Sequence, residues 1–150
     1  MLAPGHPWGE LLQYYDTLES TNTLAKTLAL QGAPHGTVII AGQQTGGRGR
    51  MGRSFHSPAG TGLYLSAILR PGCDAADLMH LTCAVAVAVC DAVEDATGLH
   101  TGIKWINDLV CGKRKVAGIL TELVLVPGTA TVDAAIIGIG INCRQSETDF

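Results

Sequence analysis

Two long apolar runs in the last third of the chain place the strongest constraint on its fold. Residues 115–126 read KVAGILTELVLV, residues 131–142 read TVDAAIIGIGIN, and the pair Pro127-Gly128 lies between them. Runs rich in β-branched residues are typical of strands, and a Pro-Gly pair favours a reversal of the chain. The sequence therefore predicts two long antiparallel strands, and with them a sheet that buries a core against another layer.

Two other segments carry helical signals. Residues 19–32 read ESTNTLAKTLALQG and place leucines and alanines on one face. Residues 75–97 are rich in alanine, valine and leucine; their valines alternate, as in a strand, but the length of the segment favours a helix. We expect a short amphipathic helix first and one buried helix second. The expected caps and stops are Ser20 or Thr21 with Gly32, and Asp74 with Gly98.

Shorter apolar stretches complete the predicted sheet. Strands are expected at 37–41, 63–69, 102–106 and 109–111, with a turn at Asn107-Asp108 and a hairpin tip at Gly112-Lys113. The length of 150 residues suits one packed domain, which we assign to 1–150. The predicted fold class is α/β (α+β): a mixed, largely antiparallel sheet with flanking helices.

Composition and charge exclude several classes of protein. The chain is 47% hydrophobic and 15% charged, which is too apolar for a disordered segment. Its net charge of −3 gives no global attraction to nucleic acid or to an anionic membrane. The apolar stretch 81–90 is stopped by Asp91, short of the roughly 20 residues that a membrane span needs. We expect a cytoplasmic protein without nucleic-acid or membrane partners.

The cysteines and histidines show no metal-binding pattern. The five cysteines are widely spaced and contain no CxxC pair, and the five histidines lack the spacing of metal ligands. We interpret the cysteines as reduced residues, mostly in the core, because free cysteine behaves as a small hydrophobic residue. No metal ligand is assigned.

A basic, glycine-rich segment at 46–53, GGRGRMGR, is the first candidate for a binding site. Glycines let backbone N–H groups face an anion, and arginines bind carboxylate or phosphate through paired hydrogen bonds. The spacing also fits dinucleotide-binding and P-loop patterns, but both require a helix to follow, and Pro58 with Gly60 prevents one. We expect a mobile loop that a small anion orders; a plain surface turn and a nucleic-acid-binding patch are the alternatives.

Two further clusters accompany the loop. Lys104, Asn107 and Asp108 precede the hairpin that leads to Lys115 and Gly118. A lysine at this place is commonly a solvated edge charge, but the second lysine and the Asn-Asp pair favour a site. The glycines at 138 and 140 stand inside a predicted strand, where they indicate either the close approach of another group or a tight bend.

Taken together, these stretches resemble the biotin protein ligase family, in order from Ser20 to Asn142. The matching text is Ser20-Thr21-Asn22, Gln44-Thr45-Gly46-Gly47-Arg48-Gly49-Arg50-x-Gly52-Arg53, Lys104-Trp105-x-Asn107-Asp108, Lys115-x-Ala117-Gly118-Ile119-Leu120-x-Glu122 and Gly138-x-Gly140-Ile141-Asn142. The related lipoate ligases share the fold but lack the Gly-Arg-Gly-Arg loop, so the resemblance favours biotin.

The resemblance implies an activity and a set of roles. Such enzymes activate biotin with ATP to biotinyl-adenylate, with Mg²⁺, and pass it to a lysine of a biotin carboxyl carrier protein such as that of acetyl-CoA carboxylase. The implied catalytic residues are Lys115 and Arg50. The implied biotin-binding residues are Ser20, Thr21, Asn22, Gln44, Gly47, Arg48, Gly49, Arg50, Lys115 and Gly118. The implied ATP-binding residues are Arg50, Arg53, Phe55, Lys104, Asn107, Asp108 and Asn142.

The chain departs from the family pattern in places. Ile106 stands for a proline, Met51 for a basic residue and Phe55 for a tryptophan. The 19 residues before Ser20 are too few for a helix-turn-helix domain, so we expect no DNA-binding repressor. The family continues beyond residue 150 with helices and a small barrel, so we expect a catalytic domain that is incomplete at its C-terminus. The alternative functions are a lipoate or octanoate ligase, and a biotin-binding fragment without full catalysis.

Overall fold

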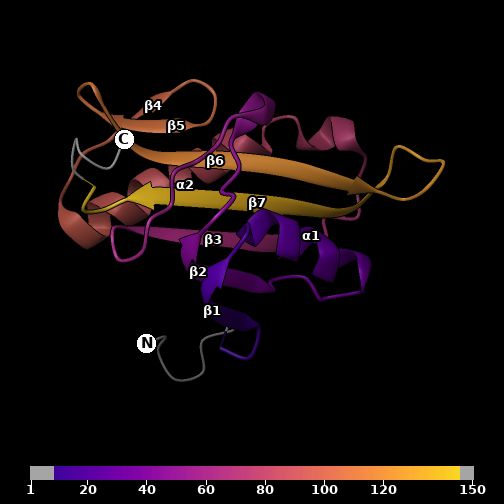
Figure 1. Ribbon diagram of the computed structural model, residues 1–150. Helices are drawn as coiled ribbons and strands as arrows, with labels where there is room; N and C mark the ends of the chain where they lie inside the picture. Colours follow the sequence, from indigo (N-terminus) through magenta and orange to yellow (C-terminus); the bar gives the residue numbers. More distant parts are fainter. Residues whose placement is uncertain (1–8, 146–150) are drawn as a thin grey trace.

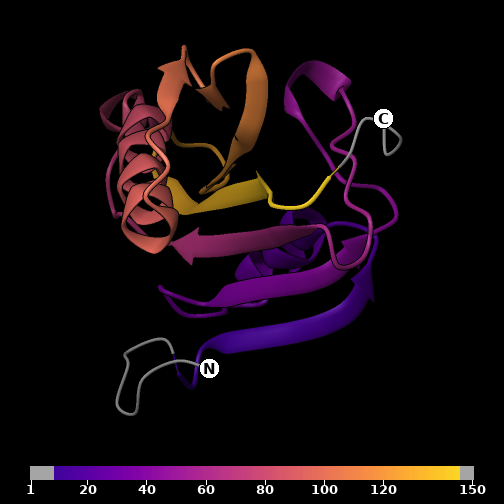
Figure 2. The same cartoon turned by 90° about the vertical axis from the view of Figure 1, so that its left-hand side faces the viewer.

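The chain folds into three layers, with one helix on each face of a central sheet (Figures 1 and 2). The computed structural model describes residues 9–145. Helix α1 and the basic loop lie on one face of the sheet, and helix α2 lies on the other (Figure 2). The elements are β1 (Leu12–Leu18), α1 (Thr21–Leu30), β2 (Val38–Gln44), η1 (Arg50–Gly52), β3 (Gly62–Leu69), η2 (Ala75–Leu78), α2 (Leu81–Thr97), β4 (Gly102–Lys104), β5 (Asp108–Cys111), β6 (Arg114–Leu125) and β7 (Val132–Asn142).

The sheet confirms the predicted fold class. Its seven strands run in the order β1-β2-β3-β7-β6-β5-β4, and β1 with β2 is the parallel pair in an otherwise antiparallel sheet. The two long apolar runs form β6 and β7, which pair antiparallel with Gly118 opposite Gly140 and Leu120 opposite Gly138. This register places glycines of neighbouring strands side by side, on the face that α1 and the loop cover.

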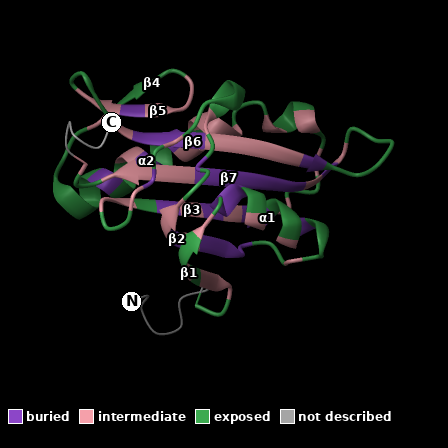
Figure 3. Cartoon of the chain, in the orientation of Figure 1, coloured by how far each residue is buried: buried purple, intermediate pink, exposed green. Residues whose placement is uncertain are grey.

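Two hydrophobic cores hold the layers together, one on each face of the sheet (Figure 3). On one face, Ala25 and Ala29 of α1 pack with Ile68 and Ile136, and all four are buried. On the other face, the buried residues of α2 pack against β5, β6 and β7. The members of this second core are Ala86, Val89, Val93, Leu109, Ala117, Ile119, Ala135 and Ile137.

The prediction of one buried helix over 75–97 was wrong in two respects. The segment is broken at 79–80 into the 3₁₀ turn η2 and helix α2, and Asp74 caps η2 instead of α2. Within α2 only Ala86, Val89 and Val93 are buried, because one stripe of the helix faces the sheet while Val87 is 51% exposed. By length and composition alone, Ala75–Thr97 could also cross a membrane, although its buried stripe packs on the sheet.

Strand β1 was not predicted, and the cysteines are less buried than expected. Strand β1 is an edge strand with one neighbour, and Tyr14 is 61% exposed, so its sequence lacks a clear apolar pattern. The five cysteines are free thiols, but Cys143 is exposed and the other four are only half-buried. The prediction that most of them lie in the core was therefore wrong; Cys90 packs at the edge of one core.

Arg70 fixes the end of helix α1 to the sheet. Its Nη2 donates to the carbonyl oxygen of Ala29 at 2.7 Å, its Nε donates to that of Ala33 at 2.9 Å, and its Nη1 pairs with Oδ1 of Asp133 at 3.0 Å. The guanidinium thus adds a second hydrogen bond to the Ala29 carbonyl, which also accepts from the N–H of Gly32, and joins the residues after the helix to the sheet.

We expect Arg70→Met to lower the free energy of unfolding by about 2 kcal/mol, because the apolar stem stays while charged hydrogen bonds to partly buried acceptors are lost. Urea denaturation followed by circular dichroism measures the change. Lys26→Ala, at an exposed position of α1, is the control and should shift stability by less than about 0.5 kcal/mol. A loss equal to that of the control would contradict the role of Arg70.

Candidate functional site

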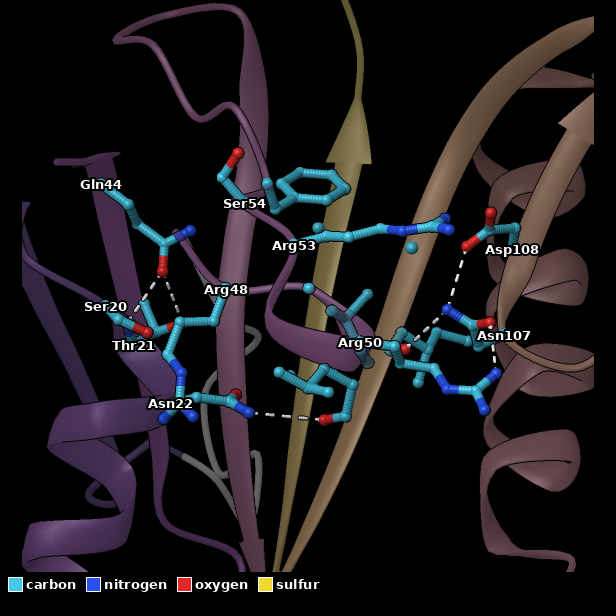
Figure 4. Close-up of a pocket in the computed structure, with 18 of the residues that line it drawn as sticks. Ser20, Thr21, Asn22, Gln44, Arg48, Arg50, Arg53, Ser54, Asn107 and Asp108 are labelled. Atoms are coloured by element: carbon cyan, nitrogen blue, oxygen red, sulfur yellow. Dashed lines mark hydrogen bonds between the residues drawn. The ribbon is translucent and has the colours of Figure 1, made fainter. Parts of the chain in front are cut away.

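A pocket opens on the α1 face of the sheet, where four segments distant in the sequence meet. It has a volume of about 170 Å³ and lies between the start of α1, the basic loop, the β5–β6 hairpin and β7 (Figure 4). The predicted site residues that line it are Ser20, Thr21, Asn22, Gln44, Arg48, Gly49, Arg50, Arg53, Phe55, Asn107, Asp108, Lys115 and Gly118. The structure therefore brings together most of the residues that the sequence singled out.

One end of the pocket is lined by hydroxyl and amide groups. Ser20 is the N-cap of α1, and its hydroxyl accepts from the N–H of Thr23. The N–H and Oγ1 of Thr21 both donate to Oε1 of Gln44, at 2.8 and 3.1 Å. Ser20 and Thr21 are buried. These bonds fix hydroxyl and amide groups that can hydrogen-bond a neutral polar ligand.

Asn22 completes this end through partners on two strands. Its Oδ1 accepts from the hydroxyl of Ser66 at 2.6 Å, and its Nδ2 donates to Oε2 of Glu122 at 2.9 Å. A Cβ atom at Gly138 would overlap the Asn22 amide, so glycine is required there by space. The prediction of a close approach at Gly138 is confirmed. Ser66 was not foreseen, because a lone serine inside an apolar strand carries no signal of its own.

The basic loop is folded back on itself beside the pocket. The N–H of Gly49 donates to the carbonyl oxygen of Arg53 at 2.7 Å, and the N–H of Phe55 donates to that of Gly47 at 2.8 Å. A Cβ at Gly47 would overlap the Phe55 carbonyl, so this glycine shapes the loop from just outside the pocket lining. At the tip, Met51 has a φ of 56° and is 89% exposed. The loop thus presents its arginines while its apolar tip faces outward.

The other end of the pocket is charged. The Nζ atom of Lys115 lies 2.8 Å from Oδ1 of Asp108 and 5.6 Å from the centre of the Phe55 ring. Asn107 donates to Asp108 at 3.0 Å and accepts from Arg50 at 3.0 Å. A carboxylate, an aromatic face and an amide therefore position two cations that come from different segments.

Glycines make room for the aromatic ring between these cations. A Cβ at Gly140 would meet the Phe55 ring, and a Cβ at Gly118 would lie 3.0 Å from both that ring and Lys115. The paired register of Gly118 and Gly140 thus forms a flat floor on which Phe55 and Lys115 rest. Of the two alternatives left open for Gly140, the close approach of another group is the one that holds, and Gly118 shows the same close approach.

Two predicted ATP-binding residues lie outside this lining. Asn142 shares a second cavity, of about 1010 Å³, with Phe55 and Lys115, and its Nδ2 donates to the carbonyl oxygen of Lys115 at 3.0 Å. Lys104 is exposed on β4 and lines neither cavity. The structure thus places Asn142 next to the charged end and Lys104 apart from it; a role for either in ATP binding stays a prediction.

The described part of the chain offers little to a metal ion on its own. Residues 9–145 contain no group of three or more histidine, cysteine, aspartate or glutamate side chains that could hold one. Asp108 supplies a carboxylate in the pocket lining. This fits Mg²⁺, which binds through one or two carboxylates together with substrate phosphates.

The order of groups along the pocket defines its chemistry. Hydroxyl and amide groups stand at one end, where Arg48 is neutralised by its ion pair with Glu122; Arg50 and Lys115 stand at the other end, and apolar residues lie along the lining. The apolar lining residues that were not predicted as part of the site are Met51, Leu65, Ile119, Leu120 and Ile139. Such a pocket suits a ligand with a neutral polar head, an apolar body and an anionic tail.

Comparison with known families settles the relationship of the chain. The model of the biotin/lipoate A/B protein ligase family matches residues 14–142. The chain belongs to this family. Its matched span contains the pocket residues from Ser20 to Gly140, so the family likeness includes the site as well as the fold.

Individual relatives point to the biotin branch. The chain is 45% identical over 142 residues to the bifunctional ligase/repressor BirA of Bacillus subtilis, covering 95% of this chain and 43% of the relative. It is 39% identical over 127 residues to the biotin–[acetyl-CoA-carboxylase] ligase of Paracoccus denitrificans, covering 83% and 51%. The chain thus spans about half the length of these curated relatives.

Solved structures agree. The biotin protein ligase of Aquifex aeolicus in complex with biotin and ATP superposes with a TM-score of 0.73 at 34% identity, covering 91% of this chain and 53% of that one. The three-layer arrangement described above is therefore that of a biotin/lipoate ligase catalytic domain.

Proposed function

We propose that the chain binds biotin and ATP, joins them to biotinyl-adenylate and transfers the biotinyl group to a lysine of a biotin carboxyl carrier protein. The observation that carries the proposal is the polarity order of the pocket, from neutral amide and hydroxyl groups to Arg50 and Lys115. Biotin has the same order: a neutral ureido ring, an apolar bicyclic body and aliphatic chain, and a carboxylate.

The residues at the polar end would hold the ureido group. Ser20, Thr21, Asn22 and Gln44 offer hydroxyl and amide groups that donate and accept hydrogen bonds, as a ureido N–H and C=O require. The aliphatic chain would lie along Ile119 and Leu120. This placement brings the carboxylate to the end of the pocket where Arg50 and Lys115 converge.

In the first step a biotin carboxylate oxygen attacks the α-phosphorus of ATP; the bond from that phosphorus to the bridging oxygen breaks, and pyrophosphate leaves. Both reactants are anions, so the barrier falls when fixed cations neutralise the charge that gathers between them. Lys115, held by Asp108 at 2.8 Å, and Arg50, held by Asn107 at 3.0 Å, are already oriented for this. Positioning and charge, without a covalent intermediate on the enzyme, carry the step.

ATP would approach from the larger second cavity. Phe55, Lys115 and Asn142 line that cavity, and Phe55 and Lys115 also line the first, so the two cavities share a boundary at which the α-phosphate would lie. Arg53 and Asp108 stand on the pocket side of it. Mg²⁺, held by Asp108 and the phosphates, would neutralise part of the triphosphate charge.

In the second step the amine of the acceptor lysine attacks the acyl carbon of the adenylate. The bond between this carbon and the phosphate oxygen breaks, AMP leaves, and an amide forms with loss of a proton from the nitrogen. Fixed cations beside the acyl phosphate again stabilise the departing anion. The acetyl-CoA-carboxylase name of the Paracoccus relative supports a carrier protein of that class as acceptor.

We expect pyrophosphate release from ATP that depends on biotin and not on lipoate. A coupled pyrophosphate assay with biotin, with lipoate and with no acid distinguishes the candidates. Release with lipoate alone would assign the chain to the other branch of its family. Biotin binding without release would identify a binding fragment and contradict the proposed catalysis.

A further inference from the structure

Glu122 of β6 uses both oxygens of its carboxylate beside the pocket, although the proposed reaction gives it no task. Its Oε1 lies 3.2 Å from Nη2 of Arg48, and its Oε2 accepts from Nδ2 of Asn22 at 2.9 Å. The side chain is 19% exposed, so the charge is largely withdrawn from water. A carboxylate that is half-buried next to a site for an anionic ligand is unfavourable unless a cation neutralises it, and here Arg48 does so.

The contact with Asn22 determines which way that amide faces. An ionised carboxylate can only accept hydrogen bonds, so the NH₂ group of Asn22 must face Glu122. The Asn22 oxygen is thereby directed to Ser66, whose hydroxyl donates to it at 2.6 Å. Together with the carbonyl oxygen of Leu120, to which Nδ2 also donates at 3.4 Å, Glu122 therefore fixes the orientation of an amide at the polar end of the pocket.

The contact with Arg48 ties the basic loop to the sheet. Arg48 belongs to the loop segment that folds back at Ser54, whereas Glu122 lies within the long strand β6. In Figure 4 the Arg48 side chain extends from the loop toward Asn22 and passes along the pocket. The ion pair therefore holds the loop over the polar end, while the Arg50–Asn107 bond holds it at the charged end.

We propose that Glu122 is a positioning residue that couples closure of the basic loop to the formation of the polar end of the pocket. One carboxylate holds Arg48 and Asn22 at once, so the loop closes onto a site whose amide is already oriented. The link that Glu122 makes between the loop and Asn22 does not depend on which ligand binds. Only the choice of biotin as a probe rests on the proposed function.

The test compares E122Q, R48Q and the double variant with wild type. In E122Q a neutral amide can still accept from Asn22, but the ion pair with Arg48 is lost. Hydrogen exchange of residues 46–53 in the ligand-free protein should become about 5- to 10-fold faster in E122Q and in R48Q. The double variant should add little further, because the two residues act through one contact.

Biotin kinetics give a second readout. E122Q should raise the KM for biotin about 5- to 20-fold, less than a fully buried charged hydrogen bond would, because Arg48 is about half exposed, and should leave kcat within about 2-fold. Arg48 is about half exposed, so high salt screens its ion pair with Glu122. Hydrogen exchange of the loop in wild type should therefore become faster at high salt, and the difference in exchange rate between wild type and E122Q should shrink. A merely structural role would not produce this salt dependence.

Glu94→Gln is the matched control, since Glu94 lies on α2, away from the pocket, with its Oε1 2.9 Å from Nδ1 of His100. It should leave loop exchange and KM unchanged. If E122Q and R48Q exchange like wild type, or if their effects add independently, the coupling is overturned. If E122Q does not fold, loop exchange in R48Q still tests the coupling, because R48Q removes the same ion pair from the other side. Absence of biotin turnover in wild type would instead contradict the proposed function, and the ligand-free exchange would still judge Glu122.

Discussion

Lys115→Ala should lower the rate of biotin-dependent adenylate formation about 100- to 1,000-fold, the usual effect of removing one group that stabilises transition-state charge. The Lys115 ammonium is fixed by Asp108 and the Phe55 face, where the two cavities meet. Its loss removes a cation and leaves the Asp108 carboxylate unpaired beside two anionic reactants. The rate is measured by pyrophosphate release at saturating biotin and ATP.

The same change should affect stability little. The Lys115 side chain is 42% exposed, and a partly solvated ion pair contributes up to about 1 kcal/mol. Thermal unfolding should therefore move by a few degrees at most, which separates a catalytic defect from a folding defect. Full pyrophosphate release in Lys115→Ala would remove this residue from the mechanism.

Lys113→Ala is the internal control and should be nearly silent. Lys113 lies exposed in the turn before β6, which begins at Arg114, so it shares no strand face with Lys115. Lys113 is not among the residues that line the pocket, so its loss should leave the rate of adenylate formation unchanged. An equal loss of activity in both variants would indicate a general change of charge on the hairpin.

The sequence predicted those parts of the fold that bury a continuous apolar stripe. The runs that became β6 and β7 lie at the centre of the sheet, so their side chains had to be apolar on both faces. Strand β1 escaped notice because an edge strand needs little apolar surface, and Tyr14 is largely exposed. The break of 75–97 at Met79 and His80 depends on packing against the sheet, which composition does not encode.

Within the site, the predictable residues were those with unusual chemistry for their position. Arginines among glycines and a lysine at the mouth of an apolar strand stand out in a sequence. Ser66 and the apolar lining residues do not, because they belong to the site only through the antiparallel register that sets Ser66 beside Gly138. Glu122 stood in the matching text without a role, and its two partners emerge only from the folded chain.

Gly138→Ala should overpack the polar end of the pocket and weaken biotin binding there. The added Cβ would overlap the Asn22 amide, whose partners Ser66 and Glu122 leave it little freedom to move. Overpacking of this kind costs about 1–3 kcal/mol. If Asn22 is displaced to relieve it, the biotin affinity should fall by the same free energy, about 5- to 150-fold.

A second change tests whether Asn22 is the group displaced. Gly138→Ala combined with Asn22→Ala frees the space, so the free energy of unfolding should recover while the biotin affinity stays low, because the amide itself is gone.

Gly102→Ala on β4 is the control: its Cβ would meet no atom closer than 4.0 Å, and neither property should change. Isothermal titration with biotin and urea denaturation measure the two quantities. If Gly138→Ala binds biotin as wild type does, the ureido group is not held at Asn22, and the polar end of the pocket serves another purpose.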